Sequence, residues 1–282
     1  MNIREALTKA RTLLREAGVD SPALDAEVLL CAVLGCGRAG LWADPERLLT
    51  EPLAREFFGL VERRRRRVPT AYLTGRKEFM GLEFSVTPAV LVPRPETELL
   101  VETALALLKE RPSPVAVDVG TGSGAIAVSI AYYHPDARVV ATDVSEEALA
   151  VAVGNARRYG LDGRITFLAG DLLEALPGDL AGHVDLIAAN LPYVSAGEMA
   201  HLPPEVQSEP AVALDGGADG LTLYRKLVPA AAFYLAGGGY LLIEIGPGQG
   251  RKALDLFAGL EWNAELRLDL AGRERLVVAR SI

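Results

Sequence analysis

The first 70 residues carry apolar side chains at intervals of three or four, the spacing of one face of an α-helix. The first such stripe consists of Ile3, Leu7, Ala10, Leu14 and Ala17. Gly18 ends this helix, and Ser21-Pro22 begins the next, with Ser at the N-cap and Pro at the first helical position. A third helix is expected over about residues 52–67. Residues 1–74 are therefore predicted to form a small helical bundle.

The pattern changes after this bundle. The segment GRKEFMGLEFSVTPAVLV alternates apolar and polar residues around Gly81, which favours a β-hairpin, and residues 75–92 are expected to be a structured linker. Beyond it, short apolar runs alternate with helical patterns up to residue 282. The predicted strands cover 115–119, 138–142, 164–169, 184–189, 239–245, 265–270 and 275–280, and the predicted helices 96–109, 124–133, 145–159, 221–235 and 249–260.

Strands that alternate with helices through short glycine-rich turns predict an open, mostly parallel, doubly wound sheet. The fold class of residues 93–282 is thus α/β and Rossmann-like, preceded by a helical bundle and a hairpin. In such a sheet, ligands bind at the carboxyl ends of the strands, so the turns after the strands are the places to look for chemistry.

Composition and charge narrow the function classes. Half of the 282 residues are hydrophobic and 23% are charged, the balance of a globular protein. The net charge is −8, divided into +2 over residues 1–70 and −10 over residues 71–282. This acidic remainder argues against a wide nucleic-acid surface, and an anionic partner is expected to meet the N-terminal part instead.

Several further classes are disfavoured by what the chain lacks. Cys31 and Cys36 form one isolated pair, which indicates reduced thiols in a cytoplasmic protein better than a zinc site. The three histidines have no ligand spacing, so no metal is expected. The charged N-terminal helix does not resemble a signal peptide, and the uncharged stretch 227–243 is too interrupted to span a membrane.

A glycine-rich turn follows the first predicted strand of the sheet. Its sequence, Asp118-Val-Gly120-Thr-Gly122-Ser-Gly124, lets the backbone approach a ligand closely where a helix begins. Asp143 ends the next strand, where a carboxylate can accept both hydroxyls of a ribose. The turn alone fits a nicotinamide enzyme as well as an adenosyl-methionine enzyme.

Two later turns extend the same edge of the sheet. Asp171 follows the third strand and can accept from an adenine amino group, or simply cap the next turn. The fourth strand ends in Asn190-Leu191-Pro192-Tyr193. Here Pro192 keeps the chain extended, so that the Asn190 amide oxygen and the Leu191 carbonyl can face one pocket. Two acceptors beside an aromatic ring suit a planar NH₂ group.

This tetrapeptide resembles the (N/D/S)PPY motif of class I methyltransferases that modify planar amino nitrogens. SPALDAEVLL, GRKEFMGLEFSV, LVPRPETELLVE, DVGTGSGAIAVSIA, ATDVSEEALAVAVGNA and ALDGGADGLTLYR are similar to segments of the peptide chain release factor N5-glutamine methyltransferases, the HemK/PrmC family. These segments extend over nearly the whole chain, including the N-terminal bundle. One departure is Leu191, where family members usually have proline.

The resemblance implies methyl transfer from S-adenosyl-L-methionine, leaving S-adenosyl-L-homocysteine, to the glutamine side-chain amide in the GGQ tripeptide of bacterial class 1 release factors. It implies that Asn190, Leu191, Pro192 and Tyr193 bind the glutamine and carry the catalysis, with Asn190 also beside the cofactor. It assigns the bundle to substrate recognition. The remaining cofactor positions that it implies are Gly120, Thr121, Gly122, Ser123, Gly124, Asp143, Asp171 and Leu172.

Other readings remain open from the residues alone. These are glutamine methylation on a ribosomal protein, N6-adenine methylation, a nicotinamide oxidoreductase, and a binding module without catalysis. Some features also lack a fixed role. The run Arg63–Arg67 is either a solvated helix end or a contact for an acidic or phosphate-bearing partner. Arg94 and Glu96 are expected near the pocket wall, the glycines of LDGGADG are expected to shape a turn, and Glu244 has no assigned role.

Overall fold

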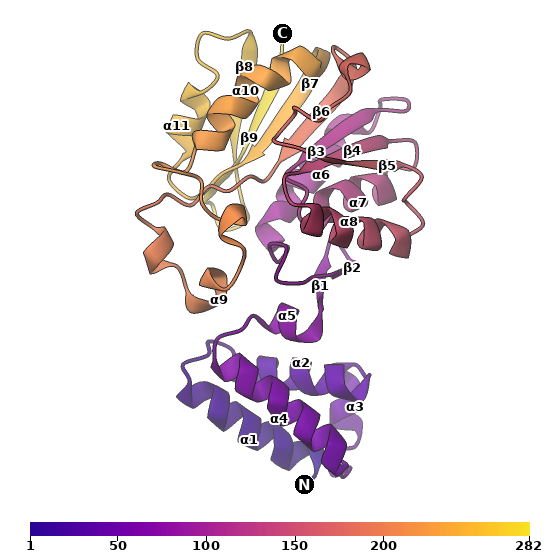
Figure 1. Cartoon of the computed structure of the whole chain (residues 1–282), viewed down its shortest axis with the longest axis vertical. Coiled ribbons are helices and arrows are strands. Elements are labelled where there is room, and N and C mark those ends of the chain that lie inside the picture. The colour runs from indigo at the N-terminus through magenta and orange to yellow at the C-terminus, as the bar shows by residue number, and fades with distance from the viewer. The chain divides into compact units, whose positions relative to one another are not determined.

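The structure is a computed structural model that describes residues 1–282 and divides into two compact units. The first unit comprises Met1–Arg76 together with Pro203–Ser208, and the second comprises Lys77–Leu202 and Glu209–Ile282 (Figure 1). No sequence pattern indicated that a short segment from the second half of the chain belongs with the N-terminal helices.

The first unit is helical, as its apolar periodicity predicted. Asn2 begins the first helix with a capping box, in which its side chain accepts from the Glu5 amide and the Glu5 carboxylate accepts from the Asn2 amide. The four members of its apolar stripe that lie within the helix are buried in a core that includes Leu29, Phe57 and Val61, whereas Ala17 is the half-buried C-cap. The helices of the unit are α1 (Ile3–Glu16), α2 (Pro22–Leu34), α3 (Arg38–Ala43), α4 (Glu51–Arg65), α5 (Thr70–Thr74) and α9 (Pro204–Gln207).

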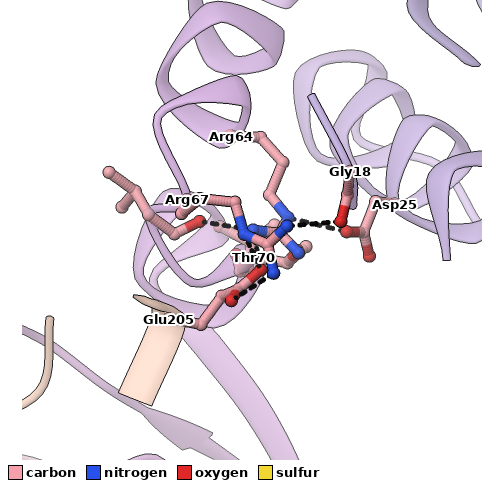
Figure 2. Close-up of polar contacts among 8 residues, drawn as sticks. Gly18, Asp25, Arg64, Arg67, Thr70 and Glu205 are labelled. Atoms are coloured by element: carbon pink, nitrogen blue, oxygen red, sulfur yellow. Dashed lines mark hydrogen bonds and ion pairs between the residues drawn. The ribbon is translucent and has the colours of Figure 1, made fainter. Parts of the chain in front are cut away.

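The arginine run at the end of α4 is largely used inside this unit. Arg64 is 6% exposed and pairs with Asp25 at 2.7 Å and with Glu205 at 2.8 Å. Arg67 also pairs with Glu205, at 2.7 Å, and donates to the carbonyl of Gly18, so two guanidinium groups converge on one carboxylate (Figure 2). Glu205 has its pKa lowered, because the hydrogen bonds from these arginines outweigh the effect of burial. The run is therefore not simply a solvated helix end.

The second unit begins within the hairpin, since Arg76, the first residue of its first strand, belongs to the first unit. The strands of the hairpin are β1 (Arg76–Phe79) and β2 (Leu82–Ser85), and their side chains Phe79 and Phe84 are buried in the core of the second unit. Asn155 fixes the hairpin by accepting from the Ser85 amide at 2.8 Å and donating to the Ser85 carbonyl at 3.0 Å. The hairpin thus packs as part of the second unit.

A seven-stranded sheet forms the centre of this unit, in the order β5-β4-β3-β6-β7-β9-β8. The first five strands in that order are parallel to one another. Strand β9 pairs antiparallel with β7, and β8 pairs antiparallel with β9. This confirms the predicted Rossmann-like α/β class. The strands are β3 (Val115–Val119), β4 (Arg138–Asp143), β5 (Ile165–Ala169), β6 (Val184–Ala189), β7 (Leu235–Glu244), β8 (Trp262–Leu268) and β9 (Glu274–Ser281).

Helices pack on both faces of the sheet, because its buried strands are apolar on both sides. Ala116 of β3 belongs to the core beneath α6, α7 and α8, whereas Val117 belongs to the core beneath α10 and α11 (Figure 1). These helices are α6 (Glu98–Leu108), α7 (Ala125–Tyr133), α8 (Glu146–Arg158), α10 (Thr222–Tyr234) and α11 (Gly250–Asp255).

Some boundaries differ from the sequence-based expectation. Strand β7 begins at Leu235, where the apolar helix pattern and a run of glycines concealed its start. Four 3₁₀ turns were not predicted, since three residues carry no periodicity. They are η1 (Pro95–Thr97), η2 (Gly178–Leu180), η3 (Met199–His201) and η4 (Ala211–Ala213). No helix of the structure combines the length and the apolar character that crossing a bilayer requires.

Candidate active site

A cavity of about 450 Å³ lies within the second unit, at the carboxyl ends of four neighbouring strands. Each of the turns singled out from the sequence contributes to its lining. The sequence-predicted residues that line it are Gly120, Thr121, Gly122, Ser123, Asp143, Asp171, Leu172, Asn190, Leu191 and Pro192.

The glycine turn is folded tightly against β4. The amides of Gly120 and Thr121 both donate to the carbonyl of Thr142, at 2.9 Å each. Gly120 has a φ of +71°, and a Cβ on it would lie 2.9 Å from Cδ2 of Leu191. Gly122 has a φ of +55°, and a Cβ there would meet no atom within 4 Å. Glycine therefore lets the turn approach Leu191 and leaves open space beside Gly122.

Asp118 holds this turn from behind. It is fully buried, and its Oδ2 accepts from the Thr121 hydroxyl at 2.6 Å and from the Ala127 amide at 3.1 Å. Burial raises the pKa of Asp118 to about 7, against the effect of these two hydrogen bonds. It is absent from the cavity lining, so it shapes the turn without facing a ligand.

Asp143 lies at the cavity edge, where it ends β4. One carboxylate oxygen accepts from the Gly122 amide at 2.8 Å, and the other accepts from the Ser145 amide at 2.9 Å. A carboxylate offers about four lone-pair positions. Asp143 can therefore hold the glycine turn and still accept hydroxyl groups from a ligand in the cavity.

The segment after β5 forms a third part of the wall. Leu172 has a φ of +51°, and its carbonyl accepts from the Thr142 hydroxyl at 2.8 Å. Asp171 is half-exposed, and the Lys226 ammonium lies 3.8 Å from its carboxylate. Its side chain therefore remains available to solvent or to a ligand.

The tetrapeptide after β6 is anchored by two buried groups that sequence reasoning missed. The side-chain nitrogen Nδ2 of Asn190 donates to the hydroxyl of Thr97 at 2.9 Å. The Leu191 amide donates to the hydroxyl of Tyr224 at 3.0 Å, and that hydroxyl in turn donates to the Glu244 carbonyl. Thr97 and Tyr224 are 4% and 0% exposed. Thr97 thus fixes the side-chain amide of Asn190, and Tyr224 fixes the backbone of the tetrapeptide at Leu191.

The glycines of LDGGADG press directly against the same segment. A Cβ on Gly216 would lie 2.6 Å from the Pro192 carbonyl oxygen, and one on Gly220 would lie 2.2 Å from the Tyr193 carbonyl oxygen. Gln249 donates to this Tyr193 carbonyl at 2.8 Å. These glycines permit the close approach of two backbone segments, beyond the turn expected for them.

Two predicted site residues do not line the cavity. Gly124 lies against Ala152 of α8, where a Cβ would come within 3.1 Å of that side chain. The ring of Tyr193 packs beside Gly246, and burial together with the nearby Glu244 carboxylate raises the pKa of Tyr193 to about 12. The role in binding the glutamine that the resemblance implies for Tyr193 stays a prediction.

The remaining lining comes from segments that sequence reasoning left out or placed only loosely. Arg94 lines the cavity as expected, and Glu209, which is 5% exposed, pairs with it and accepts from the Val92 amide at 3.1 Å. Glu96 is absent from the lining. The proline-rich sequence around Arg94 was the one sequence signal that pointed to this part of the cavity wall. Further lining residues are Phe79, Val90, Leu91, Thr97, Val212, Ala213 and Leu223.

No group of three or more His, Cys, Asp or Glu side chains lies in an arrangement that could hold a metal ion. The chemistry that the cavity itself offers is hydrogen-bond acceptance by Asp143, Asp171 and the tetrapeptide, within apolar walls.

Comparisons with known proteins cover both units. The family model described as the PrmC N-terminal domain matches residues 5–75, and the model described as a methyltransferase domain matches residues 116–208. A release factor glutamine methyltransferase of Moorella thermoacetica is 46% identical over 281 residues, which are 99% of this chain and 98% of the relative. One of Deinococcus radiodurans is 44% identical over 284 residues, 99% of each chain.

A solved structure supports the fold. The crystal structure of a methyltransferase from Pyrococcus furiosus aligns with a TM-score of 0.53 at 20% sequence identity, over 73% of this chain and 92% of that chain. At 20% identity this likeness supports the fold alone and carries no information about the substrate.

Proposed function

Because the chain belongs to the family of release factor glutamine methyltransferases, we propose that it methylates the side-chain amide nitrogen, N5, of the glutamine in the GGQ tripeptide of bacterial class 1 release factors. The observation that supports this most directly is the cavity that Asn190 and Leu191 line together with the glycine turn and Asp143. The cytoplasm, where release factors act, is the proposed site of action.

The polar groups of the cavity lining fit S-adenosyl-L-methionine. Asp143 retains acceptor positions for ribose hydroxyls, and the turn from Gly120 to Gly124 leaves open space beside Gly122. Asp171 and Leu172 line the same cavity and are proposed to contact the adenine edge. The cavity volume of about 450 Å³ lies within the usual range for small-molecule sites. When bound, this cofactor supplies an electrophilic methyl group on a sulfonium.

The residues of the chain have to make a poor nucleophile reactive, since the lone pair of an amide nitrogen is delocalised into its carbonyl. The Asn190 side-chain oxygen and the Leu191 carbonyl are the proposed acceptors for the two N–H groups of the glutamine. Two fixed acceptors orient the nitrogen and become stronger partners as positive charge develops on it. The proton leaves after transfer, and no general base is assigned.

The leucine at position 191 is compatible with this role. The proposed contribution of the position is its carbonyl, and the amide that a proline would lack is fully used here, as a donor to Tyr224. Hydrogen bonding by Tyr224 thus takes over part of the rigidity that a second proline would give. Leu191→Pro would lose this bond and gain a fixed φ.

The helical unit is proposed to recognise the release factor beyond the tripeptide. All residues that line the cavity belong to the second unit, which leaves the first unit free for docking. On this proposal a short GGQ peptide is a poor substrate compared with the intact factor, because it lacks the docking surface.

The test is transfer of labelled methyl groups to a recombinant class 1 release factor, compared with its GGQ→GGA variant. Labelling of the first and not of the second is expected. Equal labelling of both would exclude the tripeptide glutamine as the target, and no labelling of either would overturn the proposed function.

A further inference from the structure

Glu244 is a buried carboxylate that the proposed function leaves without a role. It ends β7 and is 1% exposed. The Thr97 hydroxyl lies close enough to lower the pKa of Glu244, but the contact falls short of a regular hydrogen bond, and both carboxylate oxygens remain without a full partner. A buried polar group in this condition calls for an explanation.

Thr97 connects this carboxylate to the tetrapeptide. Its hydroxyl oxygen accepts from Nδ2 of Asn190 at 2.9 Å. A hydroxyl carries a single proton, and this one is free to point at Glu244 when the oxygen is occupied by the Asn190 donor. The three side chains come from η1, from the end of β6 and from the end of β7.

The direction of this chain of contacts decides which atom of Asn190 is presented to the cavity. An ionised carboxylate only accepts hydrogen bonds, so it directs the Thr97 proton toward itself. The Thr97 oxygen can then only accept from Asn190, which turns Nδ2 toward Thr97 and leaves Oδ1 for the cavity. If the carboxyl group is protonated, it can donate to Thr97, and Thr97 can donate to Oδ1 of a flipped amide.

We propose that Glu244, acting through Thr97, is a positioning residue that holds the Asn190 amide with its oxygen toward the substrate. The inference rests on the proposed role of Asn190 as an acceptor for the glutamine N–H. A flipped amide would present NH₂ to the NH₂ of the glutamine, so the site would bind and orient it poorly.

The proposal makes methyl transfer depend on the ionisation of Glu244. Burial raises the pKa of this group to about 7, against the effects of the Thr97 contact and of nearby positive charge. Transfer is therefore expected to weaken as the pH falls through about 7. The titratable and charged groups that face Glu244 are Arg94, Glu96, Tyr193, Tyr224 and Arg275.

Single-turnover methylation of a saturating release factor, measured from pH 6 to pH 8.5, tests the dependence. The rate follows the fraction of Asn190 in the productive orientation. Glu244→Gln can donate or accept, so at pH 8 we expect a fall of about three- to tenfold and no remaining decline toward pH 6. Glu265→Gln, an exposed carboxylate paired with Arg267, is the matched control and should keep the wild-type profile.

Thr97 offers a second pair of variants for the case that Glu244→Gln does not fold. Thr97→Ser keeps the hydroxyl and is expected within about twofold of wild type, whereas Thr97→Val removes it at nearly constant volume and should lower the rate about tenfold or more. Cofactor affinity, measured by calorimetry, should be unchanged in both. Wild-type rates in Thr97→Val, or a wild-type pH profile in Glu244→Gln, would overturn the proposal.

A measurement that needs no methyl transfer separates this inference from the proposed function. The side-chain NH₂ resonances of Asn190, assigned by comparison with Asn190→Ala, should shift with pH in the wild-type protein and not in Glu244→Gln. If the enzyme fails to label release factors but this shift is present, the function is wrong and the positioning stands. If labelling succeeds and the resonances do not follow Glu244, the positioning is wrong.

Discussion

Removing one oxygen atom from Tyr224 is the most direct test of how the tetrapeptide is held. The side chain is fully buried, and its hydroxyl accepts from the Leu191 amide at 3.0 Å while it donates to the Glu244 carbonyl. Tyr224→Phe keeps the ring in place. It leaves the Leu191 amide without a partner, because the structure gives this donor no other acceptor.

The magnitude follows from that single loss. A buried donor left unsatisfied costs about 1–3 kcal/mol of stability. For a unit of about 200 residues, each kcal/mol lowers the melting temperature by about 2–4 °C, so a fall of roughly 2–12 °C is expected. The Leu191 carbonyl should also shift, and small displacements at a reacting centre can lower rates by up to about a hundredfold. We expect a loss of about ten- to hundredfold in single-turnover transfer.

Thermal unfolding followed by circular dichroism, together with single-turnover methylation, measures both effects. Tyr234→Phe is the matched control, because Tyr234 ends the same helix and its hydroxyl makes no hydrogen bond in the structure. This control should melt and react as the wild type does. If Tyr224→Phe also behaved as the wild type, the hydroxyl would be no part of the support for the tetrapeptide.

Three further outcomes are expected. Asp143→Ala should weaken cofactor binding in calorimetric titrations by about ten- to a hundredfold, because charge-assisted hydrogen bonds contribute about 1.5–3 kcal/mol; unchanged affinity would remove Asp143 from the site. Asn190→Ala should lower the rate of single-turnover transfer by a factor of about 10²–10³, the usual effect of losing one fixed hydrogen-bonding group at a reacting centre, with cofactor affinity nearly unchanged. A rate within a few-fold of wild type would mean that the tetrapeptide is only a structural turn. For Asp118, the folded pKa of about 7 lies above the unfolded value of 3.8, so its contribution to stability is full below pH 3.8 and is lost as the pH rises toward 7. Urea unfolding at several pH values should show that Asp118→Asn lacks this decline, and an identical slope in wild type and variant would contradict the assignment.

The fold was predictable because its signals are local. The helical stripe that starts at Ile3, the alternation in the hairpin and the repeated strand–helix units each depend on residues within one element. The order of the parallel strands then follows from the few topologies that short right-handed connections allow. The short turns between β6 and α10 were not predictable, since they repeat no period and their conformation depends on what they pack against.

The candidate site likewise contains positions that local sequence signals could predict and supporting groups that they could not. The positions that end strands, such as Asp143 and Asn190, were found because the carboxyl ends of parallel strands meet at one edge of the sheet. The groups that hold them were not found. Thr97 lies 93 residues from Asn190 in sequence, and Tyr224 lies 33 residues from Leu191.

What the sequence leaves open at Asn190 is the choice between its two terminal atoms. The residue type offers one acceptor and one donor group, and the motif alone does not say which of them faces the cavity. Thr97 decides this only if its own proton is committed elsewhere, and Glu244 is the buried carboxylate placed beside it. On the proposal above, the orientation of Asn190 depends on a carboxylate that ends a different strand. The same strand end, through Tyr224, also holds the backbone at Leu191, the position where a proline is usual in the family.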